Sequence, residues 1–231
     1  MCFSATASFS AGAVLLVVGA LTLHTAKTAA ASPREWLFAA IPLLFAIQQL
    51  IEGVIWLTFR VDAPLLNSVM THVYSFFSHV LWPVVVPVAV LLMEPAGWRH
   101  RALTAFVAAG AAVGAYLLVV LMAFPIVSRP TGQHIEYVSP HFFAAVTMTL
   151  YLLSTAISPL LSSHRMVVVF GALALGSFGA AYAFYAAWFI SVWCFFAALL
   201  SAVVYLHFAW KSRDNSPPVR AGARPAPQRS T

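Results

Sequence analysis

Charged side chains are scarce in this chain of 231 residues, since Lys, Arg, Asp and Glu together make up only 8% of it. A typical soluble domain carries about three times that share. The net charge is +6, but no basic patch with interleaved aromatic residues accompanies it, so no nucleic-acid partner is expected. Cysteine is limited to Cys2 and Cys194, too few for a disulfide framework.

Long apolar runs dominate instead, with 62% hydrophobic residues. Because about 20 apolar residues cross a bilayer as a helix, these runs predict an all-α polytopic bundle of seven transmembrane helices with the lipid bilayer as its main partner. Only residues 162–165 separate the fifth run from the sixth, so six spans with one re-entrant run are the alternative. The seven runs cover residues 3–26, 36–58, 68–93, 102–124, 141–162, 165–184 and 187–209.

The basic residues predict the orientation of the bundle. With seven spans, Arg60 and Arg129 fall on one side of the membrane, and the other ten of the 12 basic residues fall on the opposite side. The positive-inside rule then places the N-terminus outside and the C-terminus in the cytoplasm of a bacterial inner membrane. The first run lacks the basic start of a signal peptide. Residues 1–211 form the predicted membrane domain, and residues 212–231 a disordered basic cytoplasmic tail.

Glu52 is the only carboxylate inside a predicted span, and His72 and His79 follow in the next span. Glu52 lies about 9 Å below the outer surface, His72 about 6 Å and His79 about 16 Å. The spacing of seven between the histidines is close to two helical turns, which predicts that both project from one face together with Ser75. An ionisable group in hydrocarbon is costly and is a functional hypothesis by default.

Imidazole and carboxylate are ligands for transition-metal ions such as zinc or copper. Glu52, His72 and His79 supply three ligands, and His141 or Cys2 could supply a fourth. If Met1 is removed, Cys2 offers both an α-amine and a thiolate. This pattern predicts an outward-facing metal site in the outer half of the bundle. In an intramembrane metalloenzyme the ion would activate water for a lipid-like or small substrate from the outer side, with Glu52 as ligand or base.

Other interpretations stay open at this point. The histidines could simply hydrogen-bond to neighbouring carbonyls or to Glu52. Glu52 and His79 could form the relay of a proton-linked transporter or channel. The chain could also be a non-catalytic subunit of a homo- or hetero-oligomeric membrane complex. Haem is excluded, because two histidines on one helix face cannot clamp it from opposite sides.

Residues 125–140 form the longest predicted external connection, which carries His134, Glu136 and Tyr137. It is either a lid or ligand donor, or a loop that is merely solvated. Pro83 and Pro87 predict kinks that free backbone carbonyls in the third span. Gly110 and Gly114 predict close helix packing.

The opening residues Met1-Cys2-Phe3-Ser4-Ala5-Thr6-Ala7-Ser8-Phe9, with Gln48-Gln49-Leu50-Ile51-Glu52-Gly53, resemble an uncharacterised bacterial family of seven-span membrane proteins. The likeness covers the membrane part but not the tail, and it implies seven helices without a known activity. A fainter similarity points to the alkaline ceramidase and adiponectin-receptor-like superfamily of seven-helix zinc amidases. Ser68/His72 and Ser75/His79 match its Ser-x-x-x-His element, but the aspartate and the second histidine pair of that superfamily are absent here.

Overall fold

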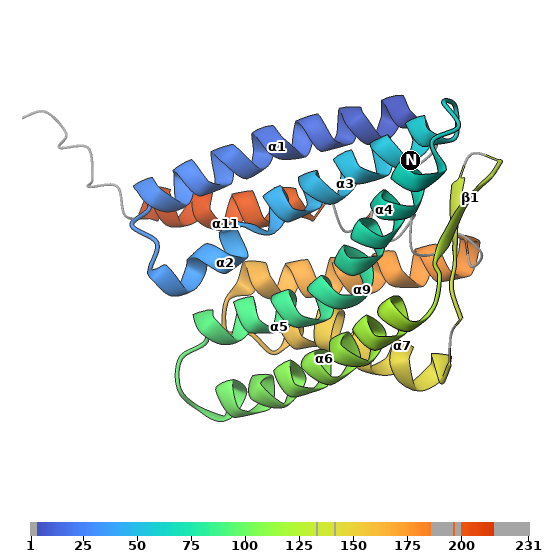
Figure 1. Cartoon of the computed structure of the whole chain (residues 1–231). Helices are drawn as coiled ribbons and strands as arrows, with labels where there is room; N and C mark the ends of the chain where they lie inside the picture. Colours follow the sequence, from blue (N-terminus) through green and yellow to red (C-terminus); the bar gives the residue numbers. More distant parts are fainter. Residues whose placement is uncertain (1–3, 133, 141, 186–195, 197–199, 215–231) are drawn as a thin grey trace, which may run out of the picture.

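The first helix, α1 (Ala5–Thr28), begins at Ser4, whose hydroxyl accepts a hydrogen bond of 3.2 Å from the Ala7 N–H. Such a cap satisfies one of the amides left without a partner at a helix start. The computed structural model describes residues 4–132, 134–140, 142–185, 196 and 200–214. Within them, helices run side by side along one direction (Figure 1).

After α1 the chain reverses direction several times. A short 3₁₀ turn, η1 (Pro33–Glu35), and α2 (Trp36–Ala39) lead into α3 (Ile41–Thr58), which packs along α1. The elements that follow are α4 (Pro64–Ser75), the π-helical segment η2 (Phe76–Leu81), α5 (Trp82–Met93), α6 (Trp98–Ala123), the strands β1 (Val127–Thr131) and β2 (His134–Val138), α7 (Ala144–Leu152), the π-helical segment η3 (Leu153–Ile157), α8 (Ser158–Leu160), α9 (Arg165–Tyr185) and α11 (Ser201–Asp214).

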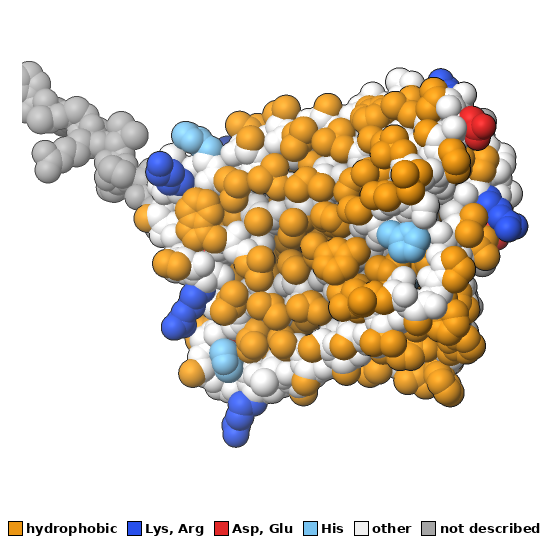
Figure 2. Space-filling model, in the orientation of Figure 1, with side chains coloured by type: hydrophobic (Ala, Val, Ile, Leu, Met, Phe, Trp, Pro, Cys, Tyr) orange, Lys and Arg blue, Asp and Glu red, His pale blue; other side chains and the backbone are white. Residues whose placement is uncertain are grey.

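Four helical segments in the described part of the chain are long and apolar enough to cross a membrane: Ala5–Thr28, Pro33–Thr58, Pro64–Met93 and Trp98–Ala123. Ala144–Leu160 and Arg165–Ala181 are shorter apolar helices. About half of the seventh predicted span, 187–209, lies outside the described residues, and α11 continues past the predicted domain boundary to Asp214. Figure 2 shows apolar side chains over the middle of the visible surface and charged ones gathered at its two ends.

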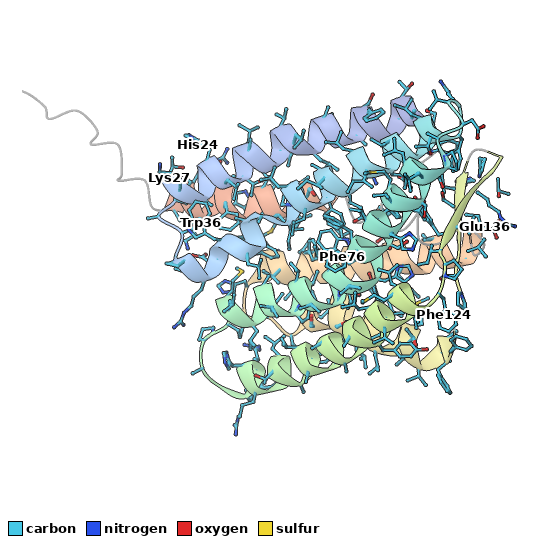
Figure 3. The ribbon with its side chains drawn as sticks, viewed as in Figure 1. His24, Lys27, Trp36, Phe76, Phe124 and Glu136 are labelled. Carbon is cyan, nitrogen blue, oxygen red and sulfur yellow. The ribbon has the colours of Figure 1, made fainter. Side chains whose placement is uncertain are left out.

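We call these ends the hairpin end and the tail end. The hairpin end holds the start of α1, the connection 59–63 and the two strands, whereas the tail end holds the end of α1, the connections 29–32, 94–97 and 161–164, and the end of α11 (Figure 1). In Figure 3, Lys27 and Trp36 lie at the tail end, and Phe124 and Glu136 at the hairpin end. The chain reversals therefore bring the named connections to two opposite ends of the bundle.

Both π-helical segments end one or two residues before a proline. In η2 the Trp82 N–H bonds to the Phe77 carbonyl, so the next amide in this register would reach the Ser78 carbonyl; Pro83 has no N–H to offer. The Tyr151 hydroxyl of α7 donates to that Ser78 carbonyl instead, at 2.6 Å. Proline thus frees a carbonyl, as predicted, and a neighbouring helix satisfies it.

The second π-helical segment, η3, shows the same arrangement before a proline. The Ser158 N–H bonds to the Leu153 carbonyl, and Pro159 leaves the Ser154 carbonyl to the Ser158 hydroxyl, at 2.6 Å. Gly110 of α6 packs between the two segments, because a Cβ there would collide with the Pro83 carbonyl and lie 3.1 Å from the Ser154 Cβ. The close packing predicted for Gly110 is confirmed.

The connection 125–140 is not merely solvated. It folds into an antiparallel hairpin in which Thr131 pairs with His134 and Val127 with Val138. Strand β2 turns Ile135 and Tyr137 inward, where they are 0% and 8% exposed and pack with Ile55 and Tyr74. The all-α prediction missed this pair of strands, which lies over the hairpin end of α3 and α4.

Candidate functional site

Glu52 lies on a polar stripe of α3 that faces the bundle interior. Gln48, Gln49 and Glu52 are all buried, at 0%, 1% and 0% exposure. The Gln48 Oε1 accepts a hydrogen bond of 2.7 Å from the Trp82 Nε1–H, and the Trp82 ring stacks on Phe45 with centroids 4.0 Å apart. The predicted stripe of α3 is therefore buried within the bundle, and α5 contacts it at Gln48.

The hairpin brings Tyr137 onto Glu52. The Tyr137 hydroxyl lies 3.5 Å from the Glu52 Oε1, at the long end of hydrogen-bonding distance. The Tyr137 ring stacks on the Tyr74 ring of α4, with centroids 4.6 Å apart and planes 7° from parallel. Residues 85 positions apart thus meet at one buried carboxylate, and the phenol comes from the connection 125–140.

A chain of polar side chains fastens the other strand of the hairpin. The Thr71 hydroxyl donates to the Ser128 hydroxyl at 2.8 Å, and Ser128 donates to the Asn67 Oδ1 at 3.0 Å. The Asn67 amide donates to the Thr58 hydroxyl at 2.8 Å, which in turn donates to the Ile55 carbonyl at 2.6 Å. We call these four side chains (Thr58, Asn67, Thr71 and Ser128) the latch.

His72 and His79 make contacts within their own helix. The His72 Nδ1 lies 2.7 Å from the Ser68 carbonyl oxygen, and the His79 Nδ1 lies 3.1 Å from the Ser75 carbonyl oxygen. The π-helical segment begins at Phe76 between them, so seven residues no longer equal two turns and the predicted shared face is altered. The His79 Nδ1 also lies 2.8 Å from the Ser78 hydroxyl oxygen. Contact with a neighbouring carbonyl was one of the alternatives left open, and both histidines make such a contact.

The described residues do not support the predicted metal centre. In this part of the chain, no three His, Cys, Asp or Glu side chains come together as a group that could hold an ion. Glu52, His72 and His79 are all described, and they form no such group. Cys2 and His141 lie outside the described residues, so the five-residue site with a zinc or copper ion stays a prediction.

Two further buried oxygen atoms belong to residues next to those just described. Gln49 Oε1 and Ser75 Oγ are enclosed with no hydrogen-bond partner among the described residues. Gln49 comes from the α3 stripe, and Ser75 ends α4 next to the stacked Tyr74. The hairpin half of the interior is thus lined by amide, hydroxyl, phenol and carboxylate oxygens. Neutral oxygens of this kind can exchange hydrogen bonds with a small polar guest.

Two further buried carboxylates lie at the tail end, where the sequence pattern did not single them out. Glu35 is 7% exposed, accepts the Ser32 N–H and lies 2.7 Å from the Lys211 Nζ of α11. Glu94 is 4% exposed, and its Oε2 accepts from the Ser163 N–H at 2.9 Å and from the Ser162 hydroxyl at 3.2 Å. Each of these carboxylates thus links two parts of the chain that are far apart in the sequence.

Sequence reasoning also missed Tyr74 and the latch. The hairpin carried a usable signal, because His134-Ile135-Glu136-Tyr137-Val138 alternates polar and apolar residues after a turn that contains Gly132. That alternation would have placed Ile135 and Tyr137 on one buried face. The latch residues carried no comparable signal, since isolated Ser, Thr and Asn residues are common at helix ends.

The comparison with protein families matches residues 1–222 to a family of unknown function, DUF6629. The chain belongs to the DUF6629 family. This agrees with the resemblance to an uncharacterised family, and the match reaches beyond the membrane part into the tail. Searches of curated proteins and of solved structures gave no match. Membership of DUF6629 therefore carries no activity over, and nothing found supports the fainter similarity to the ceramidase-like superfamily.

Proposed function

We propose that this chain is a seven-pass protein of the bacterial inner membrane, with its N-terminus outside and its tail in the cytoplasm, and that Glu52 exchanges a proton during proton-linked transport. The carried solute would be a small or lipid-like molecule from the outer side. The observation that supports this best is the complete burial of Glu52 beneath Tyr137 of the external hairpin.

A buried carboxylate is costly as an anion, so it tends to take up a proton or a cation. The Tyr137 phenol suits both protonation states, since it can donate to the carboxylate and accept from the protonated acid. The hairpin carries this phenol, and the hairpin end is the end with fewer basic residues, Arg60 and Arg129. Glu52 is thus placed to exchange a proton with the side opposite the basic tail.

His79 is the candidate for the next step inward. Its Nδ1 lies 2.8 Å from the Ser78 hydroxyl oxygen and 3.1 Å from the Ser75 carbonyl oxygen, so contacts within its own helix orient the ring. The side chain sits near the bilayer midplane in the proposed topology. A neutral imidazole can accept a proton on one ring nitrogen and release a proton from the other, as a relay requires.

Proton flux into liposomes tests this function. Liposomes with the purified wild-type protein should acidify after an imposed pH gradient, and liposomes with Glu52→Gln should behave like protein-free ones. Glu136→Gln is the matched control, because Glu136 lies on the outward side of the same hairpin. Infrared difference spectra should also lose the carbonyl band of a titrating carboxylic acid in Glu52→Gln alone. Undiminished flux in Glu52→Gln would contradict the proposal.

A zinc or copper site is the second candidate. One observation favours it: the Nδ1 of His72 lies 2.7 Å from a backbone carbonyl oxygen, the kind of contact that orients many metal-ligating histidines. The site would need Cys2 or His141 to join these residues and Glu52. Elemental analysis of the purified wild type beside His79→Ala and Glu52→Gln decides it, since unchanged metal content in both variants would remove this candidate.

A further inference from the structure

The hairpin holds its position through docking contacts. It consists of two strands, and a two-stranded hairpin is marginally stable on its own in water. Strand β2 contributes the buried Ile135 and Tyr137, and strand β1 contributes Ser128, which is 5% exposed. Other hairpin residues, including Val127 and Val138, remain exposed at 44% and 40%. A small set of contacts therefore decides whether the hairpin is docked.

The latch is the polar part of that set. Ser128 both accepts from Thr71 and donates to Asn67, so one hydroxyl links β1 to two positions one turn apart on α4. Asn67 continues the chain to Thr58, six residues beyond Glu52 on the same helix. Releasing Ser128 would free β1 while α3 and α4 keep their own contacts.

The chain has a strained residue where the hairpin meets α7. Phe143 has φ of 54°, a left-handed conformation that is uncommon for a residue other than glycine, and it is 78% exposed. Strained backbone of this kind is found at switch regions. Phe143 lies between β2 and α7, where a rotation of the hairpin would change the backbone angles.

From these observations we propose that the β1–β2 hairpin is a gate over Glu52, held closed by the latch and hinged near Phe143. This rests on the proposed function, because it names the element that controls access of water and solute to the carboxylate. In the closed state Tyr137 covers Glu52. Opening withdraws Ser128 from α4 and lifts Tyr137 from Tyr74, which exposes the carboxylate to the outer side.

A reversible cross-link tests the gate. The Thr71 and Ser128 hydroxyl oxygens lie 2.8 Å apart, which brings the two side chains within the range of a disulfide. In the double variant Thr71→Cys, Ser128→Cys, a mild oxidant should lock the hairpin and a reductant should release it. The two single-cysteine variants are the controls, since they share the native cysteines and the same treatment.

The readout is chemical access to Glu52 and does not depend on transport. A water-soluble carbodiimide with an added amine, applied from the outer side of sealed vesicles, converts an accessible carboxyl to an amide that peptide mass spectrometry detects. Glu136 is the internal reference carboxyl. Labelling of Glu52 should stop in the oxidised double variant, return after reduction, and be unaffected by oxidation in the single-cysteine variants. Equal labelling of locked and released protein would overturn the gate.

Ser128→Ala gives a second test without a cross-link. It removes both latch bonds of β1, so labelling of Glu52 should accelerate on the order of tenfold. Thr131→Ala is the matched control, because that hydroxyl lies at the exposed tip of β1. A rate equal to that of the control would overturn the gate. If labelling follows the latch but Glu52→Gln leaves proton flux intact, the gate stands and the proposed function fails.

Discussion

The buried carboxylates at the two ends of the bundle have different kinds of partner. At the tail end, Glu35 meets the Lys211 ammonium, and Glu94 accepts the amide that precedes α9. Ammonium groups and amides at a helix start stabilise a carboxylate as an anion. At the hairpin end, the neutral phenol of Tyr137 approaches Glu52 at 3.5 Å. The comparison shows that three buried carboxylates differ in their partners: an ammonium group and backbone amides at the tail end, and a phenol at the hairpin end.

The largest expected effect concerns Glu94. Hydrogen bonds to a charged group contribute about 1.5–3 kcal/mol each, so Glu94→Ala should lower the free energy of unfolding by about 3 kcal/mol. Glu52→Gln should lower it far less, because the neutral amide is the better-tolerated group in an apolar interior. Denaturant unfolding in detergent micelles measures both, with Glu136→Ala as the surface control. Equal losses for Glu94→Ala and Glu52→Gln would break the comparison.

A smaller effect on the free energy of unfolding is expected for the ion pair between Lys211 and Glu35 at the tail end. Lys211 is one-third exposed, which weakens its ion pair with Glu35 relative to a fully buried pair. Lys211→Met should therefore cost about 1–2 kcal/mol of unfolding free energy. On a Glu35→Gln background the same substitution should cost almost nothing, since the partner charge is already gone. Additive losses in this double-mutant cycle would show that the pair does not stabilise the junction of α11 with η1.

The smallest expected effect is a change with pH in how firmly the hairpin is docked. Burial lowers the pKa of His134 from its usual value, so the docked hairpin favours the neutral imidazole. The undocked form takes up a proton first as the pH falls through about 6.5. The docked hairpin is therefore most stable above about pH 6.5. Its stability falls as the pH decreases from there toward the lowered pKa of His134. Labelling of Glu52 should rise between about pH 7.5 and pH 5.5 in the wild type, and less in His134→Gln.

The sequence predicted the bundle and the polar stripe better than it predicted the site. The apolar runs predicted the helices. Gln48 and Gln49 lie one turn before Glu52 on the same face of α3, and that face is buried. The prolines Pro83 and Pro159 predicted local disruption, but not that the preceding residues would be π-helical. The segment η2 lies between His72 and His79, so a spacing counted in regular α-helical turns does not hold there.

Tail-end chemistry was missed for a related reason. Glu35 and Glu94 stand just outside the apolar runs, where carboxylates are normally solvated and attract no attention. Their burial comes from contacts across the fold: Lys211 is 176 residues from Glu35, and Ser163 is 69 residues from Glu94. A single sequence holds no signal for such pairs, whereas the hairpin carried a local one in its alternation.

The bond from Glu94 to the turn before α9 also bears on how the protein is made. The chain leaves the ribosome from its N-terminus, so the connection at 94–97 is synthesised well before the turn at 161–164. The Glu94 carboxylate is therefore part of the chain before the turn that donates to it has been made. Its two hydrogen bonds can form only after residues 162 and 163 have been synthesised.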